Sequence, residues 1–106
     1  MSRIVRATRN LGRQHEKVVR VVLFGSLACD RAGPSSDVDL LVVMRACDTP
    51  LLDRAALFRE YFLDLGVGVD LFVYTEPEVA AGNIPIATHA LRTGIVLFPP
   101  TPAQDK

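Results

Sequence analysis

Three aspartates in this 106-residue chain stand beside or inside runs of apolar, β-branched residues. Asp37 and Asp39 open the run that continues to Met44, and Asp70 interrupts a later run. Residues i and i+2 of a strand point to the same face. The Cα atoms of Asp37 and Asp39 should therefore lie roughly 6–7 Å apart. Ionised carboxylates this close repel each other unless a cation lies between them. Three carboxylates at the edge of one small sheet form a hard oxygen site that suits Mg²⁺.

A glycine-serine pair, Gly25 and Ser26, directly follows another apolar run. Glycine lets a phosphate approach the backbone, serine offers a hydroxyl, and exposed N–H groups form an anion pocket. Mg²⁺ that is held by carboxylates and bridges to substrate phosphates recurs in phosphoryl and nucleotidyl transfer. Each piece alone has an ordinary explanation as a turn, a loop end or an ion-paired strand residue. The spacing of the whole set is what indicates a phosphate and metal site.

Apolar periodicity predicts the elements that position these residues. Four runs rich in β-branched residues are expected to be strands: residues 18–24, 37–44, 67–74 and 95–98. Helical spacing predicts a first helix over residues 3–16, with Ser2 as its cap.

Two further helical segments are expected between the strands. The first starts at Thr49-Pro50 and stops at Gly66. Its apolar stripe consists of Leu51, Ala55, Phe58, Phe62 and Leu65. The second starts with the capping-box spacing of Thr75 and Glu78, and Pro85 should break it into two short helices. This mixture of elements predicts an α/β or α+β fold with a small mixed sheet flanked by helices.

Composition sets limits on the class of protein. The length fits one domain, expected over residues 1–98, followed by a polar, proline-containing tail over residues 99–106 that should be disordered. No apolar run approaches the ~18 residues of a membrane helix. No signal peptide is recognisable, and two cysteines make no disulfide framework, so a cytoplasmic protein with reduced thiols is expected.

The zero net charge argues against a dedicated nucleic-acid binder, but it hides an asymmetry along the chain. Residues 1–20 hold six bases and one acid, a net +5, and the remainder carries −5. Five polar residues fall on one face of the first expected helix or just beyond it: Arg3, Arg6, Asn10, Arg13 and Lys17. This face is either an ordinary solvated surface or a docking face for an acidic partner or a phosphate.

The segments Leu23-Phe24-Gly25-Ser26 and Ser36-Asp37-Val38-Asp39-Leu40 together resemble the signature of the DNA polymerase beta-like nucleotidyltransferases. The length resembles the minimal nucleotidyltransferases of that superfamily, which commonly act as antitoxins beside HEPN-domain RNase toxins. The similarity spans roughly residues 15 to 98, and the ending from Ala90 to Phe98 also resembles that family. The implied fold is the polymerase beta-like nucleotidyltransferase core.

The resemblance also implies a role for each motif residue. Gly25 and Ser26 would hold the triphosphate of ATP, and Asp37 and Asp39 would ligate two Mg²⁺ ions. Asp70 would complete the metal site and help to deprotonate the attacking hydroxyl. The implied reaction is an in-line displacement at the α-phosphate with pyrophosphate as leaving group.

One departure from the family pattern concerns the residues after the glycine-serine pair. Many members continue with Ala-Arg-Gly one position later, where this chain has Ala28, Cys29 and Asp30. A base near the phosphates is lost and an acid is gained, and Arg31 could partly compensate for the lost base.

Three functions remain open from the sequence. The chain could be a protein adenylyltransferase antitoxin that transfers AMP from ATP to a hydroxyl group of a HEPN toxin, that of a tyrosine. It could instead be a catalytically weak binding module that neutralises its partner by forming a complex. The third alternative is nucleotidyl transfer to RNA or to a small molecule, which the +5 N-terminal segment keeps open for RNA.

Overall fold

The structure, a computed structural model, describes residues 3–25, 38–66 and 68–99. In chain order, its elements are α1 (Arg3–Gln14), β1 (Val18–Phe24), β2 (Val38–Met44), the 3₁₀ helices η1 (Leu51–Leu57) and η2 (Arg59–Phe62), β3 (Val69–Thr75), α2 (Glu76–Ala80), α3 (Pro85–Thr93) and β4 (Ile95–Phe98). No helix in these ranges is both long enough and apolar enough to cross a bilayer.

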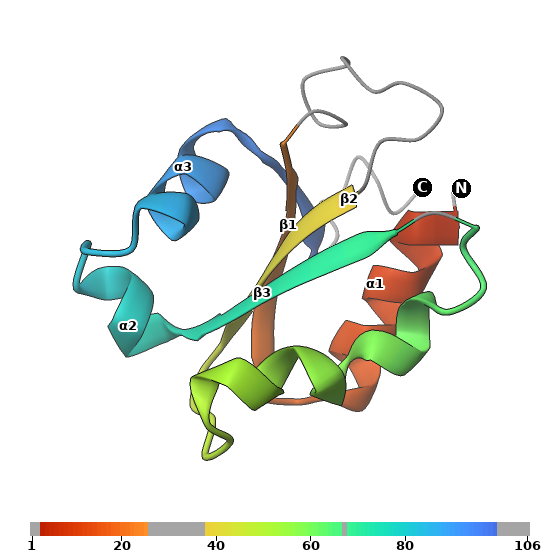
Figure 1. The fold of residues 1–106 in the computed structure, drawn as a ribbon, viewed down its shortest axis with the longest axis horizontal. Helices are drawn as coiled ribbons and strands as arrows, with labels where there is room; N and C mark the ends of the chain where they lie inside the picture. The colour runs from red at the N-terminus through yellow and green to blue at the C-terminus, as the bar shows by residue number, and fades with distance from the viewer. Residues whose placement is uncertain (1–2, 26–37, 67, 100–106) are drawn as a thin grey trace.

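The strands form one mixed sheet in the order β3-β2-β1-β4, so the expected fold class is confirmed (Figure 1). β1 pairs in antiparallel fashion with both β2 and β4, and β2 runs parallel to β3. As a result, the end of β1 and the beginnings of β2 and β3 lie at the same end of the sheet (Figure 1). The first and fourth expected strands have their predicted bounds, and the second and third lie within two residues of theirs.

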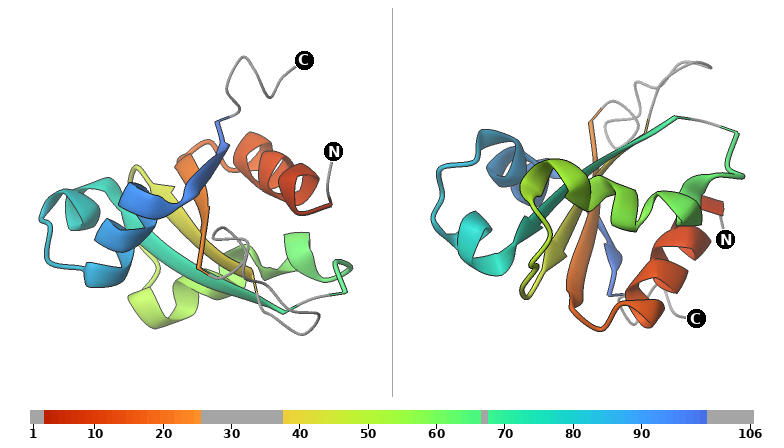
Figure 2. Two further views of the ribbon diagram at one scale, coloured as in Figure 1. Left: turned by 90° about the horizontal axis from the view of Figure 1, so that it is seen from above. Right: turned by 60° about the horizontal axis from the view of Figure 1, so that its bottom comes forward.

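Helices cover both faces of the sheet (Figure 2). On one face, Leu11 of α1 and Phe58 and Phe62 of the 3₁₀ segment pack in a core with strand residues such as Leu40 and Val42. On the other face, α2 and α3 cover a second core. The buried residues of this second core are Val22, Phe24, Leu41, Val43, Ala87 and Ala90.

The expected α-helix from Thr49-Pro50 to Gly66 is wrong in type, because the chain forms the two 3₁₀ helices η1 and η2 there. Phe58 lies between them with φ −117° and ψ −1°, and the Phe58 N–H donates to Ala55 O at 3.2 Å, an i to i+3 bond. At three residues per turn, the apolar stripe no longer stays on one face. Leu51 is therefore half exposed, whereas Phe62 remains buried.

An ion pair joins this 3₁₀ segment to α2. The buried Arg54 guanidinium donates through Nη1 to Glu78 Oε1 at 2.7 Å and through Nη2 to Oε2 at 3.2 Å. Glu78 also completes the predicted capping box with Thr75. The hydrogen bond from Arg54, followed by that from the Thr75 backbone, lowers the pKa of Glu78 to about 2. These contacts fix the beginning of α2 directly after β3.

The predicted break at Pro85 is confirmed, since α2 and α3 are separate helices and Pro85 opens α3. α3 ends at Gly94, where the chain turns into β4. A Cβ atom at Gly94 would lie within 2.6 Å of the carbonyl oxygens of Ala90 and Leu23, so only glycine fits there. Ser2 and residues 100–106, for which a cap and a disordered tail were expected, lie outside the described residues.

Candidate active site

The sheet register places two of the three predicted acids side by side. Asp39 of β2 and Asp70 of β3 are direct partners in the parallel pair. Register partners on neighbouring strands point to the same face, about 4.8 Å apart in the pairing direction. Their face is the one covered by α2 and α3, because Leu41 follows Asp39 on it and Phe72 follows Asp70. Asp39 is half-buried and Asp70 is exposed, so a solvent-accessible ligand could reach both carboxylates.

Gly25 brings the end of β1 against the first of these acids. It has a φ of +84°, in the left-handed region that favours glycine. A Cβ atom built on Gly25 would overlap Asp39 Oδ2 and lie 3.2 Å from Asp39 Cγ. The preceding residue, Phe24, is the antiparallel partner of Asp39. The glycine therefore lets the Asp39 carboxylate lie directly over the backbone at the end of β1.

Two aromatic rings pack beside the acids on the same face. The ring centroids of Phe24 and Phe72 are 5.7 Å apart with the planes tilted by 55°. Phe24 is buried, and Phe72 is two residues beyond Asp70 on β3. The two rings meet across β2, on the face that carries the acids. Phe72 was not among the predicted site residues, and its alternation with Asp70 was the signal that could have found it.

The donor set fits a divalent hard cation. Two carboxylates that share one face and one sheet edge offer the oxygen ligands that Mg²⁺ prefers. Within residues 3–25, 38–66 and 68–99, no group of three or more His, Cys, Asp or Glu side chains is gathered as a metal site. The predicted site residues Ser26 and Asp37 lie outside the described residues, as do Cys29, Asp30 and Arg31. The structure thus brings together Gly25, Asp39 and Asp70 of the predicted set.

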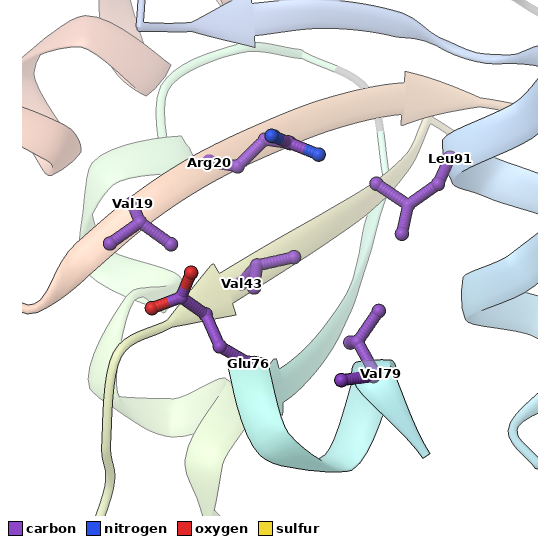
Figure 3. A pocket seen from close by; sticks show the side chains of 7 residues that line it. Val19, Arg20, Val43, Glu76, Val79 and Leu91 are labelled. Atoms are coloured by element: carbon purple, nitrogen blue, oxygen red, sulfur yellow. The ribbon is translucent and has the colours of Figure 1, made fainter. Parts of the chain in front are cut away.

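A separate hollow of about 270 Å³ lies on the same face of the sheet (Figure 3). Val43 and Leu91 contribute to its apolar lining, and Arg20 and Glu76 are its charged members. Val43 lies four positions beyond Asp39 on β2, which is about 13 Å along a strand. This hollow therefore belongs to the opposite end of the sheet and does not form part of the candidate active site.

Tyr74 shares the strand face of Asp70, because residues 70, 72 and 74 of β3 alternate onto the face of the second core. It lies four positions along β3, again about 13 Å away, and lines a hollow with Leu51 and Glu78. The two histidines are also apart from the acids. His15 contacts Tyr61 on the α1 side of the sheet, and His89 is exposed on α3.

Comparison with known proteins decides the family, because residues 3–88 match the nucleotidyltransferase domain family. The chain belongs to this family. A solved structure described as a minimal nucleotidyltransferase is 33% identical to this nucleotidyltransferase, with a TM-score of 0.60. The match covers 90% of this chain and 95% of the other. No match was found among functionally curated proteins.

Two toxin-antitoxin structures share the fold of this nucleotidyltransferase. One was solved with AMP-PNP and is 20% identical, with a TM-score of 0.69. The other, a mutant of MntA-HpeT, is 18% identical, with a TM-score of 0.66. Each match covers 95% of this chain and 77% of the other. At these identities the likeness concerns the fold alone. The family assignment itself makes the chain a nucleotidyltransferase, an enzyme class that uses a nucleoside triphosphate and a divalent metal.

Proposed function

We propose that this nucleotidyltransferase transfers AMP from ATP to a tyrosine hydroxyl on a HEPN-type toxin and so acts as its antitoxin. The observation that carries the proposal is the pairing of Asp39 with Asp70 beside Gly25, at an open end of the sheet. The described residues form one small two-faced sheet domain. The proposed acceptor is a residue of another chain. Support also comes from two neighbours of the same fold that were solved as toxin-antitoxins, one of them with the ATP analogue AMP-PNP.

In the proposed reaction, the acceptor oxygen attacks the α-phosphorus of ATP and forms the new P–O bond. The bond from the α-phosphorus to the bridging oxygen breaks, and pyrophosphate leaves with that electron pair. Asp70 accepts the proton of the attacking hydroxyl. Asp39, together with Asp37, would hold the divalent metal. We propose a pair of Mg²⁺ ions, which would supply charge stabilisation to the phosphate oxygens when bound. Gly25 and Ser26 hold the triphosphate, since the backbone after β1 can approach it closely.

The test is to incubate the full chain with Mg²⁺, radiolabelled ATP and its cognate HEPN protein. Label is expected on the HEPN protein, with an adenylyl group on tyrosine by mass spectrometry. Asp39→Asn should reduce the labelling rate by at least ~10²-fold, because a charged ligand of the metal that stabilises the transition state is lost. Asp48→Asn, which removes the same charge at an exposed position after β2, is the matched control and should retain activity.

Two results would count against the proposal. An unlabelled HEPN protein that is nevertheless neutralised, by wild type and Asp39→Asn alike, would favour the binding module. Label on RNA or a small molecule in place of the protein would change the acceptor class.

A further inference from the structure

A row of polar, mostly basic side chains runs along the outer face of α1. Arg3, Arg6, Asn10 and Arg13 are all exposed and are separated by three, four and three residues. Side chains at this spacing fall on one helix face, and the row spans about 15 Å at 1.5 Å rise per residue. α1 contains no acidic residue.

Helix stability favours Arg13, which lies in the last turn of α1, but it does not explain Arg3 and Arg6 at the beginning of the row. The N-terminal end of a helix carries partial positive charge, so acidic residues are stabilising there and basic residues are not. α1 has no acid in its first turn and instead begins with Arg3 and Arg6. In the described parts of the chain, neither Arg6 nor Arg13 forms an ion pair or a hydrogen bond. Basic residues in the first turn that go against this preference, without an ion pair to offset the cost for Arg6, indicate a functional surface.

The row is also shaped to receive a partner. Arg6 and Asn10 line both of two neighbouring hollows, which have volumes of about 350 and 430 Å³. Arg13 also lines the smaller hollow. Tyr61 and Leu65 line the larger one. Arginine and tyrosine beside apolar surface are the residue types enriched at protein interfaces.

From this arrangement we infer that the outer face of α1 is a docking surface for an acidic, helical segment of a protein partner. Carboxylates on such a segment, spaced three, four and three residues apart, would lie opposite the row. The spacing reads the same in both directions, so either orientation of the segment would match it. Arginine forms bidentate pairs with carboxylates and is preferred over lysine in interface ion pairs.

An acidic protein segment fits this surface better than RNA does. The rest of the chain beyond residue 20 carries a net −5, which repels a long polyanion that extends past the row. A short acidic segment is limited to the row itself. Leu65, which lines the larger of the two hollows, adds an apolar contact that a phosphate backbone would not use.

The position of the row connects it with the candidate active site. Arg3 Nη1 donates to the backbone oxygen of Asp64 at 3.2 Å, in the segment that leads into β3. The first turn of α1 therefore lies toward the end of the sheet that carries Asp39 and Asp70 (Figure 1). A partner docked on α1 would present a neighbouring segment at that end. This link rests on the proposed function, whereas docking itself needs neither nucleotide nor metal.

The test uses fluorescently labelled peptides and the full chain, without ATP or Mg²⁺. The first peptide is a stabilised helix with glutamates at the three-four-three spacing, and the second has the same composition with its glutamates distributed around the helix. A single-stranded RNA oligonucleotide is the third probe. Fluorescence anisotropy at low and physiological salt gives each dissociation constant, and attraction between exposed charges should weaken as salt rises.

The expected result is tightest binding of the in-register peptide by wild type. The double variant R6E with R13E should bind it at least about tenfold more weakly, because two attractions become repulsions. The matched control, R45E with R92E, changes the net charge equally at exposed positions off α1 and should bind like wild type. Circular dichroism establishes that both variants are folded.

Several outcomes overturn the inference. Equal binding of the two peptides, equal loss in the control variant, tighter binding of RNA, or no peptide binding at low salt would each do so. The comparison of the two peptides on the wild type tests the inference even if the R6E and R13E variant does not fold. Transfer of AMP in the experiment on the HEPN protein is scored separately, so either proposal can fail without the other.

Discussion

Replacing Gly25 with alanine tests the contact that joins the end of β1 to the candidate metal ligand Asp39. Two costs are expected. The left-handed φ of +84° costs an alanine roughly 1–2 kcal/mol. The new Cβ would overlap Asp39 Oδ2, and moving that carboxylate off its rotamer costs about 0.5–1.5 kcal/mol more. Gly25→Ala should therefore lower the free energy of unfolding by about 1.5–3.5 kcal/mol.

Gly82→Ala is the matched control, because Gly82 has a similar φ of +75° but nothing lies within 4 Å of its Cβ position. It should lose only the backbone cost of about 1–2 kcal/mol. The two unfolding free energies are measured by urea titration followed by circular dichroism. Their difference isolates the contact with Asp39.

The functional consequence is larger than the difference in stability. A displacement of about 1 Å in a catalytic group can cost ~10²-fold in rate. The rate of adenylyl transfer should therefore fall by about 10²-fold in Gly25→Ala. The affinity for Mn²⁺, a spectroscopic substitute for Mg²⁺, should also fall, as measured by electron paramagnetic resonance. Gly82→Ala should retain both properties. If the two variants were equal in stability and Mn²⁺ binding, the contact between Gly25 and Asp39 would have no part in the site.

Three further predictions concern the scaffold. Glu78→Gln should cost about 1–2 kcal/mol at neutral pH, less than the full pKa shift implies because 37% of the side chain is exposed. This contribution is present above pH 4.5 and is lost as the pH falls toward 2, so urea titrations of wild type and variant should converge in acid. Gly94→Ala should lose about 2–3 kcal/mol, since its Cβ would meet two backbone oxygens that cannot move aside, and an unchanged urea midpoint would contradict that packing. Tyr61→Phe removes the 2.8 Å hydrogen bond to Gln14, so the free energy of unfolding should fall by about 1 kcal/mol in a thermal unfolding experiment. Tyr74→Phe is the control.

Alternation within each strand made the faces predictable from the sequence. Asp70 lies opposite Val69, Leu71 and Val73, as its position in the apolar alternation predicted. The pairing of Asp70 with Asp39 was not predictable, because a period of two fixes the face of a residue and leaves its neighbour on the next strand open. The contact of Gly25 with Asp39 depends on the same register.

The segment after β2 shows why helix type was missed. Phe58, between the two 3₁₀ helices, and Phe62, at the end of the second, are buried, as they would also be in an α-helix. Leu51 distinguishes the two, and it is exposed because the tighter turn rotates it away from the core. Thr49 and Pro50 gave a start signal that both helix types share.

The parallel pairing of β2 with β3 also determines when the site can exist during synthesis. Parallel strands need a long crossover, and here roughly thirty residues separate Asp39 from Asp70. At ~5–20 residues per second, the ribosome takes seconds to add them. A nascent chain that has completed β1 and β2 holds Gly25 and Asp39 but has no Asp70 beside them. The emerging enzyme therefore cannot bring its two acids together until β3 has left the ribosome and joined the sheet.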